Sequence, residues 1–285
     1  MSEAFSPSVG LVVTSFARVI PFIIVAFLLF CFRENRYLIK NRYFLLVFSI
    51  SIPILFVTTN PIVSARFWLA TVFLTLAYIL KSSFFKTWYF PHLFILSFIL
   101  IFPMLDVFRY GTEIDDFRFI SDLSLQLTTN GDFDSFQQIL NSILYTFNST
   151  LLLGENILVA FLFFIPRSIW VEKLYHSGIL VAQNAGLNYE NLSLPLWGEF
   201  IISFGLLMPL FFVLFAFLIK KIDQTNYLNP KYIITTFFSF YLFISLRGSL
   251  LTAVSLLFPV LIVFLIYRFT CFRKAQITNF AKSFD

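Results

Sequence analysis

The residues in this chain whose chemistry stands out are cations placed at the ends of apolar runs. Arg247 lies in "FISLRGSLLTAVSLLFP", between two apolar segments with almost no loop between them, and Arg167 follows Pro166 at the end of "FLFFIP". A cation beside hydrocarbon is costly and usually has a partner. A guanidinium stays charged and forms bidentate hydrogen bonds with phosphate. We interpret both arginines as candidate ligands of a phosphate or diphosphate, against the alternative of interfacial anchors.

The residues after Arg167 add to this group. "RSIWVEKLYHS" contains Trp170, Lys173 and His176. The ammonium of Lys173 and the imidazole of His176 would add positive charge or proton transfer, and Trp170 is a candidate aromatic platform for a sugar. The alternative for each is an ordinary structural role.

Carboxylates supply the candidate bases. "RYGTEIDDFRF" places Asp115 and Asp116 between Arg109 and Arg118, and "LPLWGEF" places Glu199 at the start of an apolar run. A carboxylate is a plausible base for a sugar hydroxyl, and the flanking arginines are candidate substrate ligands. The alternatives are a solvated loop for the first cluster and, for Glu199, a favourable interaction with a helix N-terminus.

The elements that position these residues must lie in a membrane. Of the 285 residues, 59% are hydrophobic and only 12% charged, and the mean hydropathy is +0.87. Soluble domains carry about 25% charged residues. The composition predicts an all-α integral membrane protein, because several apolar runs approach helical spanning length and none alternates as barrel strands do. We expect one polytopic domain over residues 1–285.

Other classes of site find no support in the residues. The two cysteines, Cys31 and Cys271, and the two histidines, His92 and His176, have no metal-ligand spacing. No phosphate loop, dinucleotide turn or nucleophile elbow occurs. We therefore expect no metal and no cofactor, and we do not interpret the net charge of +5 as a nucleic-acid signal.

We predict about seven membrane-spanning helices and one half-helix. The predicted spans are Val9–Phe32, Tyr43–Thr58, Phe67–Leu80, His92–Phe108, Leu196–Ile219, Tyr232–Leu246 and Leu250–Tyr267. The run Leu151–Ile165 ends at Pro166 and is shorter than the roughly 20 residues of a full crossing. We interpret it as a re-entrant or interfacial half-helix.

The distribution of basic residues supports this topology. Four segments hold 13 of the 20 basic residues, namely Arg33, Arg36, Lys40 and Arg42, then Lys81 and Lys86, then Lys220, Lys221 and Lys231, and lastly Arg268, Arg273, Lys274 and Lys282. These four segments lie on the same side of the membrane only if the run Leu151–Ile165 does not cross it. Basic loops are typical of the cytoplasmic side.

The opposite face then carries a large loop region over residues 109–195. Within it, Ser135–Phe147 has apolar residues at helical spacing, which predicts an amphipathic helix on the membrane surface. Asp134 in "GDFD" is expected to cap that helix.

The order of four motifs resembles the O-antigen polymerases, the Wzy-type oligosaccharide repeat-unit polymerases of bacteria. The motifs are "GDFDSFQQILNSILYTF", "FLFFIPRSIWVEK" with "SGILVAQNAG", "SLPLWGEFIISFG" and "SLRGSLLTAVSLLFP", over Gly131–Pro259. This covers about half of the chain. "WVEKLYHS" stands where the family pattern has prolines at the positions of Val171 and Leu174, while Lys173 matches. Family members usually have more spanning helices.

The resemblance implies a glycosyltransferase at the periplasmic face of the bacterial inner membrane. Its substrate would be an oligosaccharide carried on undecaprenyl diphosphate, and its product would serve lipopolysaccharide, capsule or exopolysaccharide. Membrane lipid and a chain-length regulator protein would be its partners. The alternatives are an O-antigen ligase-like transferase, a transporter or flippase for a lipid-linked sugar, and a non-catalytic membrane scaffold.

Overall fold

A computed structural model describes residues 7–60, 64–97, 134–187, 193–223 and 231–282. Within these ranges the chain is helical and has no strand, as the composition predicts. The first part of the chain forms α1 (Pro7–Glu34), η1 (Arg36–Lys40), α2 (Arg42–Thr58), α3 (Arg66–Leu80) and η2 (Ser82–Lys86), and residues 89–97 are helical. The predicted span His92–Phe108 continues outside the described residues.

The second part of the chain contains shorter helices and then three longer ones. They are α6 (Ser135–Asn148), α7 (Glu155–Phe161), α8 (Ser177–Asn184), α9 (Leu196–Phe204), η5 (Gly205–Leu207), α10 (Met208–Asp223), α11 (Lys231–Arg247) and α12 (Leu250–Lys282). Two segments among the described residues are long and apolar enough to cross a membrane, Pro7–Glu34 and Leu196–Lys220. The apolar helices α2, α3, α11 and the first part of α12 are shorter.

The core lies where α1, α3, α11 and α12 pack together. The ring of Trp68 in α3 contacts Phe22 of α1 and Phe237 of α11, with ring centroids 5.8 and 6.2 Å apart. The hydroxyl of Tyr241 in α11 donates to the carbonyl of Ala253 in α12. Edge-to-face aromatic pairs and interhelical hydrogen bonds of this kind hold helices together where burial in lipid contributes little.

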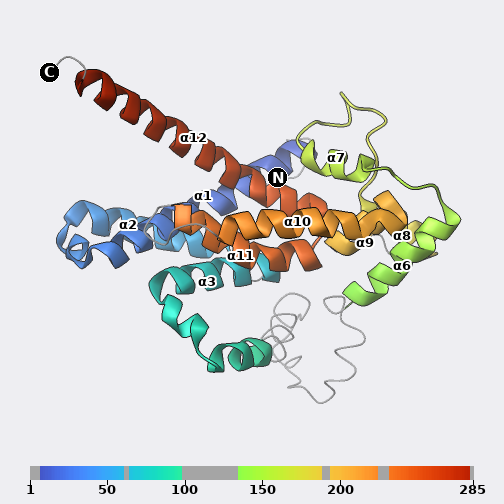
Figure 1. The fold of residues 1–285 in the computed structure, drawn as a ribbon, viewed down its shortest axis with the longest axis horizontal. Coiled ribbons are helices and arrows are strands. Elements are labelled where there is room, and N and C mark those ends of the chain that lie inside the picture. The colour runs from blue at the N-terminus through green and yellow to red at the C-terminus, as the bar shows by residue number, and fades with distance from the viewer. Residues whose placement is uncertain (1–6, 61–63, 98–133, 188–192, 224–230, 283–285) are drawn as a thin grey trace.

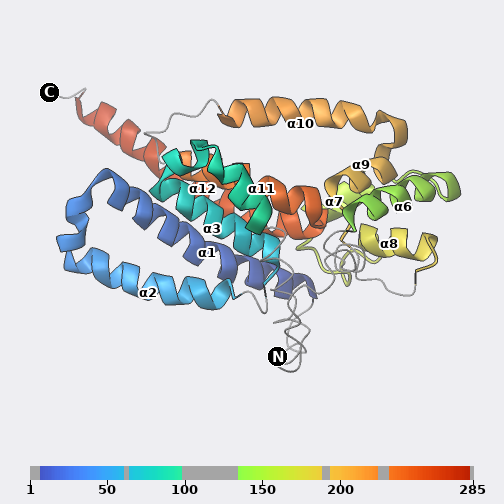
Figure 2. The ribbon, with the colours of Figure 1, turned by 90° about the horizontal axis from the view of Figure 1, so that it is seen from below.

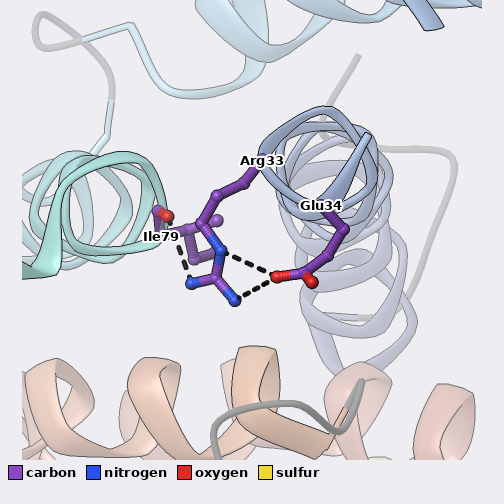
Figure 3. Close-up of polar contacts among 3 residues, drawn as sticks. All are labelled: Arg33, Glu34 and Ile79. Atoms are coloured by element: carbon purple, nitrogen blue, oxygen red, sulfur yellow. Dashed lines mark hydrogen bonds and ion pairs between the residues drawn. The ribbon is translucent and has the colours of Figure 1, made fainter. Parts of the chain in front are cut away.

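The basic segments gather at one end of the bundle. Figure 1 shows the α1–α2 turn and the C-terminal end of α12 on the same side of the molecule. Arg33, near the end of α1, donates to the carbonyl of Ile79, near the end of α3, at 3.4 Å (Figure 3), and lies 5.0 Å from the ring of Tyr232 at the start of α11. The same guanidinium pairs with Glu34 at 2.9 Å. The structure thus places these basic segments at one end of the bundle. The side of the membrane that they face stays a prediction.

The other end is formed by α6, α7, α8 and the start of α9 (Figures 1 and 2). We call this the α6–α9 end. α7 is seven residues long, or about 10 Å at 1.5 Å per residue, which is far short of a crossing. α7 covers only the middle of the run Leu151–Ile165, and the half-helix predicted there stays a prediction.

The predicted span Leu196–Ile219 is not a single helix. Gly205 breaks it with φ +54° and ψ −123°, a conformation that essentially only glycine adopts. The amides of Leu152 and Leu153 donate to the carbonyls of Ile202 and Ser203 at 3.0 Å, so the groups freed by the break have partners. Beyond it, α10 packs mainly on α9 and η5, and Figure 2 shows it lying beside the bundle.

Candidate functional site

Arg247 ends α11 at the α6–α9 end of the molecule. Only Gly248 and Ser249 separate it from α12, and a Cβ on Gly248 would lie 2.8 Å from the carbonyl oxygen of Ile244, so the tight turn requires glycine. The guanidinium of Arg247 lies 2.8 Å from Oδ1 of Asp134, and 14% of the arginine side chain is exposed. It also lies 5.7 Å from the ring of Phe67 at the start of α3. The turn thus holds the cation between three helices.

Asp134 does not act as the predicted cap of α6. Its side chain accepts no hydrogen bond from the first turn of the helix. Instead it pairs with Arg247, and Oδ2 accepts from Nε2 of Gln138 at 3.1 Å. An ion pair with a guanidinium is stronger than a bond to a neutral backbone amide, which explains the different partner.

The predicted amphipathic helix is confirmed as α6, but its polar side faces inward. Gln138, Asn141 and Ser142 are buried on a helix that packs on α8 and α9, whereas Phe136 and Phe147 are 71% and 81% exposed. A helix in water buries its apolar side. The inverted arrangement is the one expected for a helix whose outer side contacts lipid.

Arg167 and Lys173 bind the backbone of the loop that follows α7. The guanidinium of Arg167 donates to the carbonyls of Lys173 and Leu174 and lies 4.4 Å from the ring of Tyr175. The ammonium of Lys173 donates to the carbonyls of Leu162, Phe163 and Ile165, at 2.8 to 3.2 Å. Both cations therefore stabilise the loop.

The ammonium of Lys173 has little capacity left for a substrate. An ammonium has three N–H donors, and each has a backbone acceptor here. Burial lowers the pKa of Lys173, and the neighbouring Arg167 guanidinium lowers it further. A phosphate would have to displace one of these carbonyls, so the predicted substrate contact of Lys173 requires the loop to rearrange. Trp170, with its ring 5.9 Å from this ammonium, belongs to the same loop.

His176 caps α8. Its Nδ1 accepts a hydrogen bond from the amide of Gly178 at 3.1 Å, which requires that this nitrogen carry no proton. Burial lowers the pKa of His176 below its ordinary value of 6.5. The neutral imidazole is therefore the form that the folded chain favours.

Lowering the pH below about 6.5 is expected to loosen α8 in the wild-type chain. Because the pKa of folded His176 lies below that of the unfolded chain, the unfolded state binds more protons in this range, and the free energy of unfolding falls as the pH falls. In His176→Asn the amide oxygen can cap the helix without titrating. The protection factors of the α8 amides, which are corrected for the pH dependence of intrinsic exchange, should fall as the pH falls in the wild type and stay constant in the variant. Equal profiles of the protection factors would contradict this role.

Glu199 is buried in a polar cluster and does not face solvent. Its side chain is 2% exposed, and Oε2 accepts from Nδ2 of Asn156 at 2.7 Å. Ser177 and the backbone of Leu250 lie beside its carboxyl group. The hydroxyl of Ser203 donates to Oδ1 of Asn156 at 2.5 Å. The cluster joins α7, α8, α9 and α12, so direct substrate binding by Glu199, predicted from the sequence, would require the cluster to open.

An apolar groove of about 560 Å³ lies between α7, α9 and α10. Its walls include Leu158 and Phe161 of α7, Phe200 and Phe204 of α9, and Phe211 of α10. The rings of Phe204 and Phe211 stack with centroids 3.8 Å apart. Leu162, whose carbonyl accepts from Lys173, also lines the groove, so a cation lies close to this apolar surface.

The segments that carry the two arginines pack at different heights along α12. Arg247 stands just before Leu250, whereas the chain leading to Arg167 packs through Phe163 and Phe164 on Phe258. Leu250 and Phe258 are about 12 Å apart along the helix axis, at 1.5 Å per residue. Joint action of both arginines on one phosphate group stays a prediction.

The remaining predicted site residues, Arg109, Asp115, Asp116 and Arg118, lie outside the described residues. In the part of the chain that the structure describes, no three His, Cys, Asp or Glu side chains come together as metal ligands do. Sequence reasoning missed Asn156 and the pairing of Asp134. A polar Asn156 early in an apolar run was a usable signal, because polar residues in such runs usually pair with one another.

Comparison of the chain with protein-family models, curated proteins and solved structures finds no match.

Proposed function

We propose that this chain is a membrane glycosyltransferase that polymerises oligosaccharide repeat units carried on undecaprenyl diphosphate. The observation that carries the proposal is the position of Arg247. It is a largely buried cation at a helix break, at the end of the bundle away from the basic loops, and a cation held beside apolar surface suits the anionic head of a lipid diphosphate. The resemblance over Gly131–Pro259 points to the same substrate class.

The proposed membrane arrangement follows the charge pattern. The chain would cross the bacterial inner membrane about seven times, with α7 as a re-entrant or interfacial half-helix and residues 109–195 at the periplasmic face. The gathering of the basic loops around Arg33 supports a common cytoplasmic side for them. The outward apolar side of α6 supports contact of the periplasmic region with lipid.

The reaction would be a displacement at the sugar carbon that bears the diphosphate. A hydroxyl of the acceptor repeat unit forms the new bond to this carbon, the bond from carbon to the diphosphate oxygen breaks, and the hydroxyl proton passes to a base. The guanidinium groups of Arg247 and Arg167 offset the negative charge that grows on the leaving diphosphate. Asp115 and Asp116 are the candidate bases. His176, also predicted from the sequence, could take the proton only if Nδ1 left the amide of Gly178. The groove between α7, α9 and α10 offers apolar surface for the carrier chain.

The test uses the full chain in liposomes with purified lipid-linked repeat units. We expect a ladder of products whose sizes differ by one repeat unit. Transfer of glycan to a lipid-core acceptor without a ladder would instead support a ligase-like enzyme. Movement of the lipid-linked sugar across the bilayer without any new bond would support a flippase. No change in the substrate under any of these conditions would contradict a catalytic role.

A further inference from the structure

We propose that the buried polar side of α6 positions Arg247, with Asp134 and Gln138 as positioning residues. The inference rests on the proposed function, in which Arg247 binds the donor diphosphate. It gives a role to a feature that the proposed reaction leaves unused, namely a helix that turns Gln138 and Asn141 inward and Phe136 and Phe147 outward.

A chain of hydrogen bonds runs along α6 and ends at Asp134, whose carboxylate is ion-paired with Arg247. Nε2 of Gln137 donates to Oδ1 of Asn141 at 3.1 Å, Nδ2 of Asn141 donates to Oε1 of Gln138 at 3.3 Å, and Nε2 of Gln138 donates to Oδ2 of Asp134 at 3.1 Å. The other carboxylate oxygen, Oδ1, lies 2.8 Å from Arg247. Each side chain thus fixes the next, and the last one fixes the cation.

Burial makes this chain rigid. Gln138 is 1% exposed and Asn141 is 7% exposed, and a buried amide that loses its partner is left with an unsatisfied polar group that water cannot reach. Gln138 therefore cannot turn away cheaply, and Oδ2 of Asp134 stays engaged. The guanidinium is held at one edge by Asp134 and has the ring of Phe67 beside it, 5.7 Å away. An ion pair and an aromatic ring from different helices restrict the position of the guanidinium.

Orientation matters because a guanidinium binds phosphate oxygens in a fixed planar geometry. Misplacement of a catalytic group by about 1 Å can reduce a rate about 100-fold. Asp134 also has a cost for binding, because its negative charge opposes the charge of a diphosphate. The positioning role therefore predicts opposite effects of Asp134 on donor affinity and on the rate of the chemical step.

The experiment compares three variants with the wild type in liposomes. They are Asp134→Asn, Asp134→Glu and a double variant that exchanges the two charges, Asp134→Arg together with Arg247→Asp. Each rate is divided by the amount of folded protein. For Asp134→Asn we expect a kcat that is about 10- to 100-fold lower, with a KM for the lipid-linked donor that is equal or lower. Asp134→Glu should recover part of kcat. The exchange restores the ion pair, so it should recover thermal stability without recovering polymer.

A purely structural ion pair predicts a different outcome. In that case the charge exchange would recover polymer together with stability, and Asp134→Asn would keep the wild-type kcat per folded molecule. Either result would overturn the positioning role.

A second measurement separates this proposal from the proposed function. Nitrogen-15 NMR of arginine side chains, with Arg247→Lys to assign the signal, reports rotation of the guanidinium. We expect slow rotation in the wild type and fast rotation in Asp134→Asn and Gln138→Leu. Slow rotation in a wild type that forms no polymer would reject the proposed function alone, and fast rotation in an active wild type would reject the positioning role alone.

Discussion

Replacing Arg247 by alanine is expected to lower the rate of polymer formation about 100- to 1,000-fold, the usual effect of removing one group that stabilises charge in a transition state. The guanidinium of Arg247 stands at the break between α11 and α12, beside the start of α6, where it pairs with Asp134. Its loss also leaves the carboxylate of Asp134 with less positive charge to oppose it. The rate is measured from the ladder of repeat units, scaled to folded protein.

Arg33 provides the matched control for this prediction. It is also a guanidinium that pairs with a carboxylate, that of Glu34 (Figure 3), and lies beside an aromatic ring, but it is at the opposite end of the bundle. Arg33→Ala should lower stability and leave the rate per folded molecule near that of the wild type. Arg247→Lys should fall between wild type and alanine, because the charge remains and the bidentate geometry is lost. A normal ladder from Arg247→Ala would remove the central support of the proposed function.

Replacing Glu199 by alanine is expected to destabilise the α6–α9 end by about 1 to 3 kcal/mol, the cost of leaving a buried polar group without its partner. Asn156 would lose an acceptor inside a site that water does not reach freely, and the shorter side chain would leave a cavity. The loss should appear as faster hydrogen exchange in α7 and α8 and as a lower free energy of unfolding in bicelles.

Two variants separate the causes of this loss. Glu199→Gln keeps the size and one acceptor oxygen, so it should cost less than alanine. Asn156→Leu removes the donor to Oε2 and should destabilise the same helices. If Glu199→Ala unfolds at the same temperature as the wild type, the cluster does not hold these helices together.

The long helices were predictable because their boundaries coincide with changes in composition. α2 and α3 begin one residue before the predicted spans Tyr43–Thr58 and Phe67–Leu80 and end where those spans end, at polar or charged residues. Polar side chains do not enter hydrocarbon cheaply. The extension of α12 beyond Tyr267 was not predicted, since the apolar signal stops where the helix leaves the bundle.

The break at Gly205 could not be read from the sequence. "IISFGLLMPL" is apolar on both sides of the glycine, and a single glycine inside such a run is tolerated in helices. The partners that allow the break are the amides of Leu152 and Leu153, which come from a distant part of the chain. Only tertiary structure brings them to the carbonyls that the break leaves open.

The candidate site was predicted in part for the same reason. The local pattern around Arg247, a cation and a glycine between two apolar runs, located the helix break correctly. Its partner Asp134 lies far away in sequence and was interpreted through its local setting as a cap, which was wrong. Glu199 was interpreted as a candidate base at the start of an apolar run, but Asn156, Ser177 and Leu250 surround it.

The inverted orientation of α6 also predicts how its sequence can change over evolution. On most surface helices the polar positions vary freely and the apolar ones are constrained. On α6 the constraint falls on Gln138 and Ser142, whose side chains are enclosed, while Phe136 and Phe147 need only remain apolar. Substitutions of glutamine by glutamate or lysine, which count as conservative in water, would be the damaging ones here.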